Sequence, residues 1–94
     1  MNDETARNLA GRALVYIAQE PERIRQFLAI TGIGPAEIRA RAQDPAFLAG
    51  ILDHLLSDEA MLLDFAAWAE IDTSSVGRSR QFLPGGEATY TKEH

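Results

Sequence analysis

The sequence predicts an all-α protein, folded as a compact bundle of five to six short helices. Apolar residues recur at three- and four-residue steps along most of the chain, which is the spacing of one helix face. Prolines and glycines stand where helices would begin and end, and no segment shows the pattern of a strand. The 94 residues are 46% hydrophobic, enough for one small core. We therefore expect a single helical domain over residues 1–84 and a disordered polar tail over residues 85–94.

Three helices are predicted in the first half of the chain. The first covers about residues 3–18, and Pro21 begins the second, because proline disfavours helical geometry in the residue before it and suits a first turn. Gly32 fits the left-handed conformation that ends a helix. Gly34 then caps a third helix, which ends near residue 43. The apolar stripe of the first helix contains Ala6, Leu9, Ala10, Ala13, Leu14 and Ile17.

Three further helices are predicted in the second half. Asp44 followed by Pro45 opens the fourth, which breaks just before Asp58. A fifth helix over about residues 58–70 is apolar nearly all round, so we expect it at the centre of the bundle. Asp72 can cap a sixth helix, although serines and a glycine weaken it. The apolar residues of that sixth helix would be Val76, Phe82 and Leu83.

The chain also shows a weak internal repeat. A shift of 38 residues places Phe27 on Phe65 and aligns the helix breaks of the two halves. A true duplication would make the second and fifth helices equivalent elements at the centre and bring the two phenylalanines close together. Identities are few, so convergent patterning of amphipathic helices explains the alignment as well. Other matched pairs are Leu14 with Leu52, Ile17 with Leu55 and Ile24 with Leu62.

Composition excludes several classes of protein. The chain has no cysteine, which excludes disulfides, thiolate nucleophiles and cysteine-ligated metal sites. Its first residues are acidic and polar, unlike a secretory signal, and its most apolar stretch, residues 60–69, is far shorter than the roughly 20 residues that cross a bilayer. We expect a cytoplasmic protein with no membrane partner.

Negative charge is concentrated in one part of the chain. Fourteen acidic and nine basic residues give a net charge of −5. Residues 44–72 contain acidic residues but no lysine or arginine. These acids either form an ordinary solvated surface or recruit a basic partner, which could be the arginine-rich side of another copy. The candidate acidic patch consists of Asp53, Asp58, Glu59 and Asp64.

Residues that could carry out catalysis are scarce. His54 lies three residues before Ser57 and four before Asp58, a spacing that on a continuous helix would suit a metal site or a base with its orienting acid. The predicted helix break falls between them, however, and the serine and aspartate are explained by capping. We therefore expect no catalytic residue, no metal, no cofactor and no enzymatic activity.

One turn resembles a nucleic-acid-binding motif. Gly32-Ile33-Gly34 is similar to the hairpin of the helix-hairpin-helix family, which implies backbone amides presented to a phosphate, with Arg39 and Arg41 adding contacts. A glycine closure followed by a capped helix accounts for the same residues without a ligand. The net negative charge opposes tight duplex binding, so weak phosphate or nucleic-acid binding is kept only as an alternative.

Most of the chain, from about residue 9 to residue 86, resembles a family of small bacterial proteins grouped as domain-of-unknown-function family 3572. The resemblance implies a short helical bacterial protein and brings no activity, cofactor or catalytic residue. An aspartate commonly stands at the position of Gly34 in that family, which favours capping over phosphate binding there. The segments that carry the resemblance are residues 13–18, 20–23, 27–32, 44–50, 55–60 and 83–86.

The function that these patterns favour is that of a non-catalytic protein-interaction module. Val15, Tyr16 and Ile30 lie off the main apolar stripes and are the candidate interface. The alternative is that neighbouring helices cover them, since a six-helix arrangement can bury two faces of one helix. The partner would be another protein or a second copy of the chain.

Overall fold

A computed structural model describes residues 2–84 of the chain. Over this range the secondary structure is helical throughout, which confirms the predicted all-α class. No helix within these residues combines the length and the apolar composition needed to span a membrane. The tail predicted to be disordered lies outside the described residues. The helices are α1 (Asp3–Ala18), α2 (Pro21–Thr31), α3 (Pro35–Arg41), α4 (Pro45–Leu56), α5 (Glu59–Ala69) and α6 (Thr73–Arg80).

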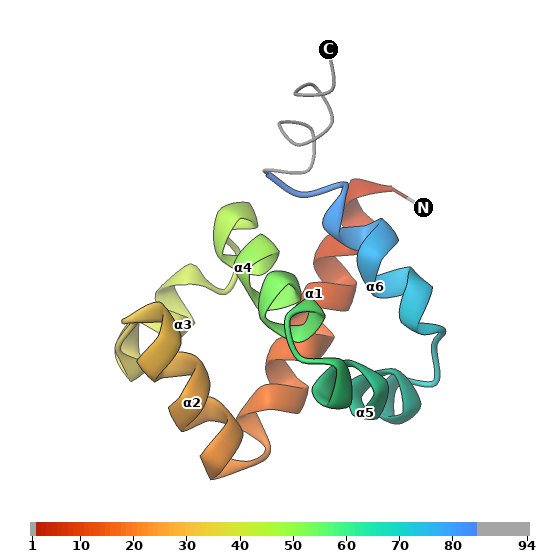
Figure 1. Cartoon of the computed structure of the whole chain (residues 1–94). Coiled ribbons are helices and arrows are strands. Elements are labelled where there is room, and N and C mark those ends of the chain that lie inside the picture. Colours follow the sequence, from red (N-terminus) through yellow and green to blue (C-terminus); the bar gives the residue numbers. More distant parts are fainter. Residues whose placement is uncertain (1, 85–94) are drawn as a thin grey trace.

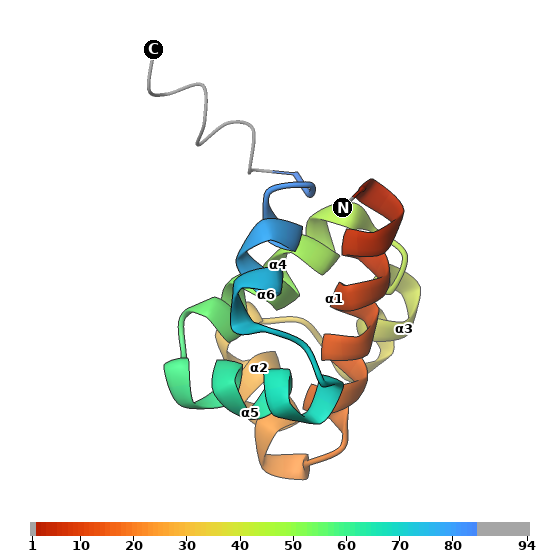
Figure 2. The ribbon, with the colours of Figure 1, turned by 90° about the vertical axis from the view of Figure 1, so that its right-hand side faces the viewer.

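Helices α1 and α4 form the centre of the fold and make the most extensive helix contact in it. Figure 1 shows them crossing in the middle, with α2 and α3 on one side and α5 and α6 on the other. Figure 2, turned by 90°, shows α6 beside α4 and α1. Each central helix buries apolar residues on a wide face, so each can be covered from two sides. The fully buried side chains at this crossing include Ile17, Ile51, Leu52 and Leu55.

The prediction that the fifth helix is central is wrong. Helix α5 covers one end of the α1–α4 pair and leaves Leu63 and Trp68 exposed. One face of α5 packs on the core, where it buries the large side chain of Phe65 together with smaller ones such as Ala69. The apolar residues on its other face remain at the surface.

The contacts do not support the predicted symmetric repeat. The ring of Phe27 packs against Phe47 and His54 of α4, whereas the ring of Phe65 packs against Tyr16 and Trp68. Helix α6 packs on α1, α4 and α5, but its counterpart α3 buries none of its residues. The second and fifth helices are therefore not an equivalent central pair.

Local chemistry sets the helix ends largely as predicted. Asp44, Asp58 and Asp72 each accept a hydrogen bond from a first-turn backbone N–H at 3.1 to 3.3 Å. Gly32 ends α2 in the left-handed conformation, with φ of 74°. Glu70 ends α5 in the same conformation, with φ of 59°, which is unfavourable for a residue with a Cβ atom.

The sixth helix is shorter than predicted. It ends at Arg80, so Phe82 and Leu83 follow it in a turn instead of lying on its apolar face. Within this turn Leu83 is buried and Phe82 is exposed. The chain thus inserts one apolar side chain into the core as it leaves α6.

Replacing Leu52 with alanine should lower the free energy of unfolding by about 2–5 kcal/mol, because the side chain is fully buried in α4 and its loss leaves a cavity. The same replacement at Leu63, which is 55% exposed, should cost less than about 1 kcal/mol. Urea unfolding followed by circular dichroism measures both. Equal losses would contradict the central position of α4.

Candidate functional site

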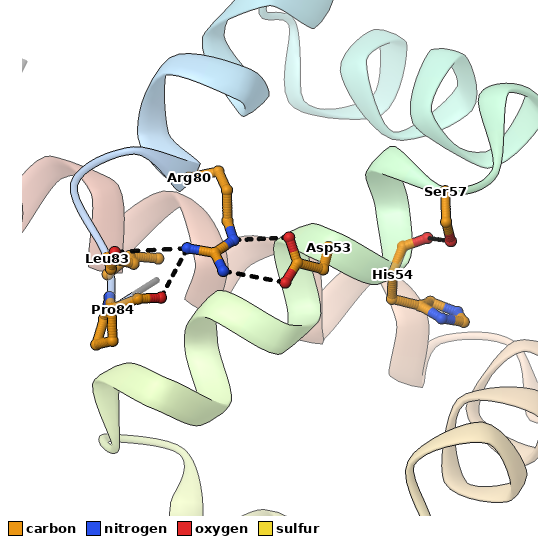
Figure 3. Close-up of polar contacts among 6 residues, drawn as sticks. All are labelled: Asp53, His54, Ser57, Arg80, Leu83 and Pro84. Atoms are coloured by element: carbon orange, nitrogen blue, oxygen red, sulfur yellow. Dashed lines mark hydrogen bonds and ion pairs between the residues drawn. The ribbon is translucent and has the colours of Figure 1, made fainter. Parts of the chain in front are cut away.

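His54 lies in the last turn of α4 and is half-buried. Its ring meets Phe27 edge to face, with the centroids 5.1 Å apart, and its Nε2 atom is buried without a hydrogen-bond partner. The neighbouring hydroxyl of Ser57 donates to the backbone carbonyl of His54 at 2.8 Å, as Figure 3 shows, and Asp58 caps α5. The serine and the aspartate that the sequence placed near the ring thus make structural contacts.

Burial lowers the pKa of His54, because the charged imidazolium loses hydration; the charge of Asp58 opposes this in part. The ring is therefore held in its neutral form to lower pH than a solvated histidine. Among residues 2–84, no group of three or more histidine, cysteine, aspartate or glutamate side chains is placed to hold a metal ion.

One residue of the candidate acidic patch, Asp53, is paired with an arginine that the sequence did not indicate. Arg80 of α6 forms a bidentate contact with Asp53 of α4, with Nε–Oδ1 at 2.6 Å and Nη2–Oδ2 at 3.1 Å. Its Nη1 atom also donates to the carbonyls of Leu83 and Pro84 (Figure 3). The pair joins residues 27 positions apart and ties the end of α6 to α4. The carboxylate of Asp53 is therefore paired with a cation, and no local sequence pattern indicated this partner.

Tyr16, one of the candidate interface residues, is buried, with 3% of its surface exposed. Its hydroxyl donates to Asp64 Oδ2 at 2.5 Å, and the guanidinium of Arg23 lies 3.9 Å from its ring centre. The rings of Phe65 and Trp68 pack on it as well. Burial, with the bond to Asp64, raises the pKa of Tyr16 to about 12, although Arg23 acts in the opposite direction. The expectation of an exposed Tyr16 is thus corrected by the packing of α5.

A shallow depression of about 540 Å³ opens above this tyrosine. Asp64 forms part of its wall and is exposed. Arg23 is the one cationic residue in the lining; its Nη2 atom lies 3.8 Å from a carboxylate oxygen of Glu20, and its Nη1 atom is buried without a hydrogen-bond partner. Three carboxylates and one guanidinium thus stand around a partly apolar depression, and Glu22 is in addition paired with Arg25 at 2.8 Å. Its lining consists of Tyr16, Glu20, Glu22, Arg23, Ala60, Met61 and Asp64.

A second hollow, of about 400 Å³, lies between α1, α2 and α3 and is mainly apolar. We call it the α1–α3 groove. Val15, one of the candidate interface residues, lies in its wall with 54% of its surface exposed. Ile30 is also exposed but does not line the groove, so the three candidate interface residues do not form one patch. The lining consists of Leu14, Val15, Ala18, Ile24, Leu28, Pro35, Ile38, Arg39 and Ala42.

In the turn that resembles a helix-hairpin-helix motif, backbone N–H groups are bonded within the turn itself. The backbone N–H of Gly34 donates to Glu37 Oε1 at 2.9 Å, and the N–H of Glu37 donates to the carbonyl of Gly34. A carboxylate thus takes the position that a phosphate would need, which favours the capping interpretation. Of the two arginines, Arg39 lines the α1–α3 groove, and Arg41 lies 4.0 Å from Glu37.

The described residues form a small all-α bundle whose surface includes an apolar groove and a depression lined by carboxylates. A model of the family described as "Protein of unknown function (DUF3572)" matches residues 3–86, so the chain belongs to this family. This confirms the family predicted from the sequence. No curated protein and no solved structure matches the chain.

Replacing Arg80 with methionine should lower the free energy of unfolding by about 1–2 kcal/mol, since it removes the pair with Asp53 and the bonds to two turn carbonyls. The matched control is Arg78 to methionine on the same helix, where the guanidinium reaches only two serine hydroxyls at 3.4 Å. That control should change stability by less than about 0.5 kcal/mol. Thermal or urea unfolding measures both, and indistinguishable variants would contradict a structural role for the pair.

Acidification should destabilise the wild type more than a His54→Phe variant. Because burial lowers the pKa of His54 in the folded state, the unfolded state binds more protons as the pH falls below about 6.5. The histidine's contribution to stability is therefore lost through that window and is constant above it. Phenylalanine keeps a ring beside Phe27 but cannot titrate. Urea unfolding at pH 7.5 and pH 5 checks this; an equal loss in both proteins would show that His54 does not couple to folding.

Proposed function

We propose that this protein is a non-catalytic interaction module that binds an amphipathic helix of a partner protein in the α1–α3 groove. The observation that carries the proposal is the apolar wall of that groove, in which the side chain of Val15 is more than half exposed. A partner side chain placed there would remove this surface from water, which is favourable.

The charge at the edge of the groove indicates the chemistry of the partner. Arg39 is exposed and is the only charged residue in the lining. An acidic residue next to the apolar face of the partner helix would be attracted to it. A helix whose leucine-like side chains are flanked by glutamate or aspartate is therefore the occupant that fits best.

The contacts around His54 support a role without catalysis. A base needs a partner that orients it and a group from which it takes a proton. Here the Ser57 hydroxyl donates to a carbonyl, Asp58 caps α5 and Asp53 pairs with Arg80. Since these polar groups are used for structure, an interaction role accounts for more of the molecule than an enzymatic one. The chain has no cysteine and therefore no disulfide that would need an oxidising compartment, and we propose that it acts in the cytoplasm.

A Val15→Asp variant should lose a partner that the wild type retains. The new carboxylate would place an unpaired charge in the apolar contact and would repel an acidic partner helix. Affinity-tagged protein is expressed in its native cells, and the proteins that co-purify are quantified by mass spectrometry. At least one should fall by roughly tenfold or more with the variant, which corresponds to about 1.4 kcal/mol.

The matched control is Asn8→Asp, which adds the same charge at an exposed position of the same helix outside the groove. Circular dichroism verifies that both variants fold. If the two variants retain the same proteins as the wild type, the groove is not the binding surface. Light scattering of the wild type at two concentrations separates a foreign partner from a second copy.

A further inference from the structure

The outward face of α5 is an apolar stripe that the fold leaves uncovered. Leu63 and Trp68 are 55% and 42% exposed, respectively, and Ala60, Asp64 and Ala67 are exposed beside them. Counted from Ala60, the other four residues follow after 3, 4, 7 and 8 positions, which is the spacing of one side of a helix. We call this set the α5 stripe. It is distinct from the apolar face of the same helix that packs on the core.

The shape of the α5 stripe suits another helix. Two large side chains, Leu63 and Trp68, stand next to the small side chains of Ala60 and Ala67. A row that alternates large and small residues provides ridges and grooves for the side chains of a second helix. Trp68 is held in place by its ring contacts with Tyr16 and Phe65, at centroid distances of 5.6 and 6.0 Å. The stripe is therefore ordered before any partner binds, which reduces the entropy cost of binding.

The charge around the stripe selects a basic partner. Glu59 and Glu70 lie at the two ends of α5, and Asp64 lies within the stripe. Asp64 also forms a wall of the acidic depression, where its carboxylate is held by the Tyr16 hydroxyl. Three carboxylates line that depression. Arg23 stacks on the tyrosine ring and lies 3.8 Å from Glu20, and Arg25 pairs with Glu22 at 2.8 Å, so the carboxylates exceed the nearby guanidinium groups by one. A lysine or arginine side chain entering the depression would meet excess negative charge.

We propose that the α5 stripe and the adjoining acidic depression bind a basic amphipathic helix, with its apolar residues on Leu63 and Trp68 and a lysine or arginine in the depression. This inference does not rest on the α1–α3 groove. Figures 1 and 2 place α3 and α5 on opposite sides of the molecule, and the groove carries the opposite charge at its edge. The two surfaces therefore select partners of different chemistry.

Trp68 reports directly on the proposed contact because it is the only tryptophan of the chain. The probe is a synthetic helical peptide of leucine and lysine, with the leucines on one face, titrated into the full-length protein at low salt. Its binding should shift the Trp68 emission to shorter wavelength and saturate. A peptide with glutamate in place of each lysine should produce no shift, and added salt should weaken the binding of the lysine peptide. No saturable shift with the lysine peptide, or an equal shift with both peptides, would overturn the proposal.

Two variants locate the binding surface. Leu63→Gln removes an exposed apolar contact and should weaken binding of the lysine peptide roughly fivefold. Val15→Gln makes the same kind of change in the α1–α3 groove and should leave the affinity unchanged. If Val15→Gln weakens binding and Leu63→Gln does not, the stripe is not the site. If the Trp68 emission shifts with protein concentration in the absence of peptide, a second copy covers the stripe, which also overturns the proposal.

Discussion

The structure depends on the packing of α1 across α4. Helices of seven to sixteen residues are marginal in water on their own, so each must be stabilised by the surface that it covers. Leu52 and Ile17 are fully buried at this crossing, and α2, α5 and α6 each pack against at least one of the two central helices. Helix α3 is the exception, because it buries no residue fully and is positioned mainly by the turn before it and by the half-buried Ile38.

The acidic residues of the chain serve two different purposes. Asp44, Asp58 and Asp72 cap helices, and Asp53 holds the turn after α6 through Arg80. Those on the outward side of α5, together with the acids of the depression, are left facing solvent beside apolar side chains. The excess negative charge is therefore not spread evenly over the molecule. The outward side of α5 carries Glu59, Asp64 and Glu70, whereas the apolar groove on the other side carries an arginine.

The composition of the fifth helix led to the wrong prediction of its position. The fifth helix has too few polar residues for an ordinary surface helix, and such a helix is normally placed at the centre. In the structure Met61, Phe65, Ala66 and Ala69 of α5 are buried and Leu62 is partly buried against the core, whereas Leu63 and Trp68 are exposed. A helix that is apolar on two faces can be buried on both, or it can pack with one face and leave the other exposed. Single-helix periodicity does not distinguish these two cases, because it contains no information on which neighbours are present.

What the sequence determined by itself was the set of helices and their ends, because these depend on residues within four positions of each other. Gly32, Pro21 and the aspartate caps act through local backbone geometry and hydrogen bonds, and their positions were predicted closely. The tertiary structure alone decided which apolar residues are covered. Tyr16 is covered by α5, where Asp64, 48 residues away, accepts a hydrogen bond from its hydroxyl, and Arg80 pairs with Asp53 at a separation of 27 residues. Such contacts depend on how whole helices pack in space, which no local pattern encodes.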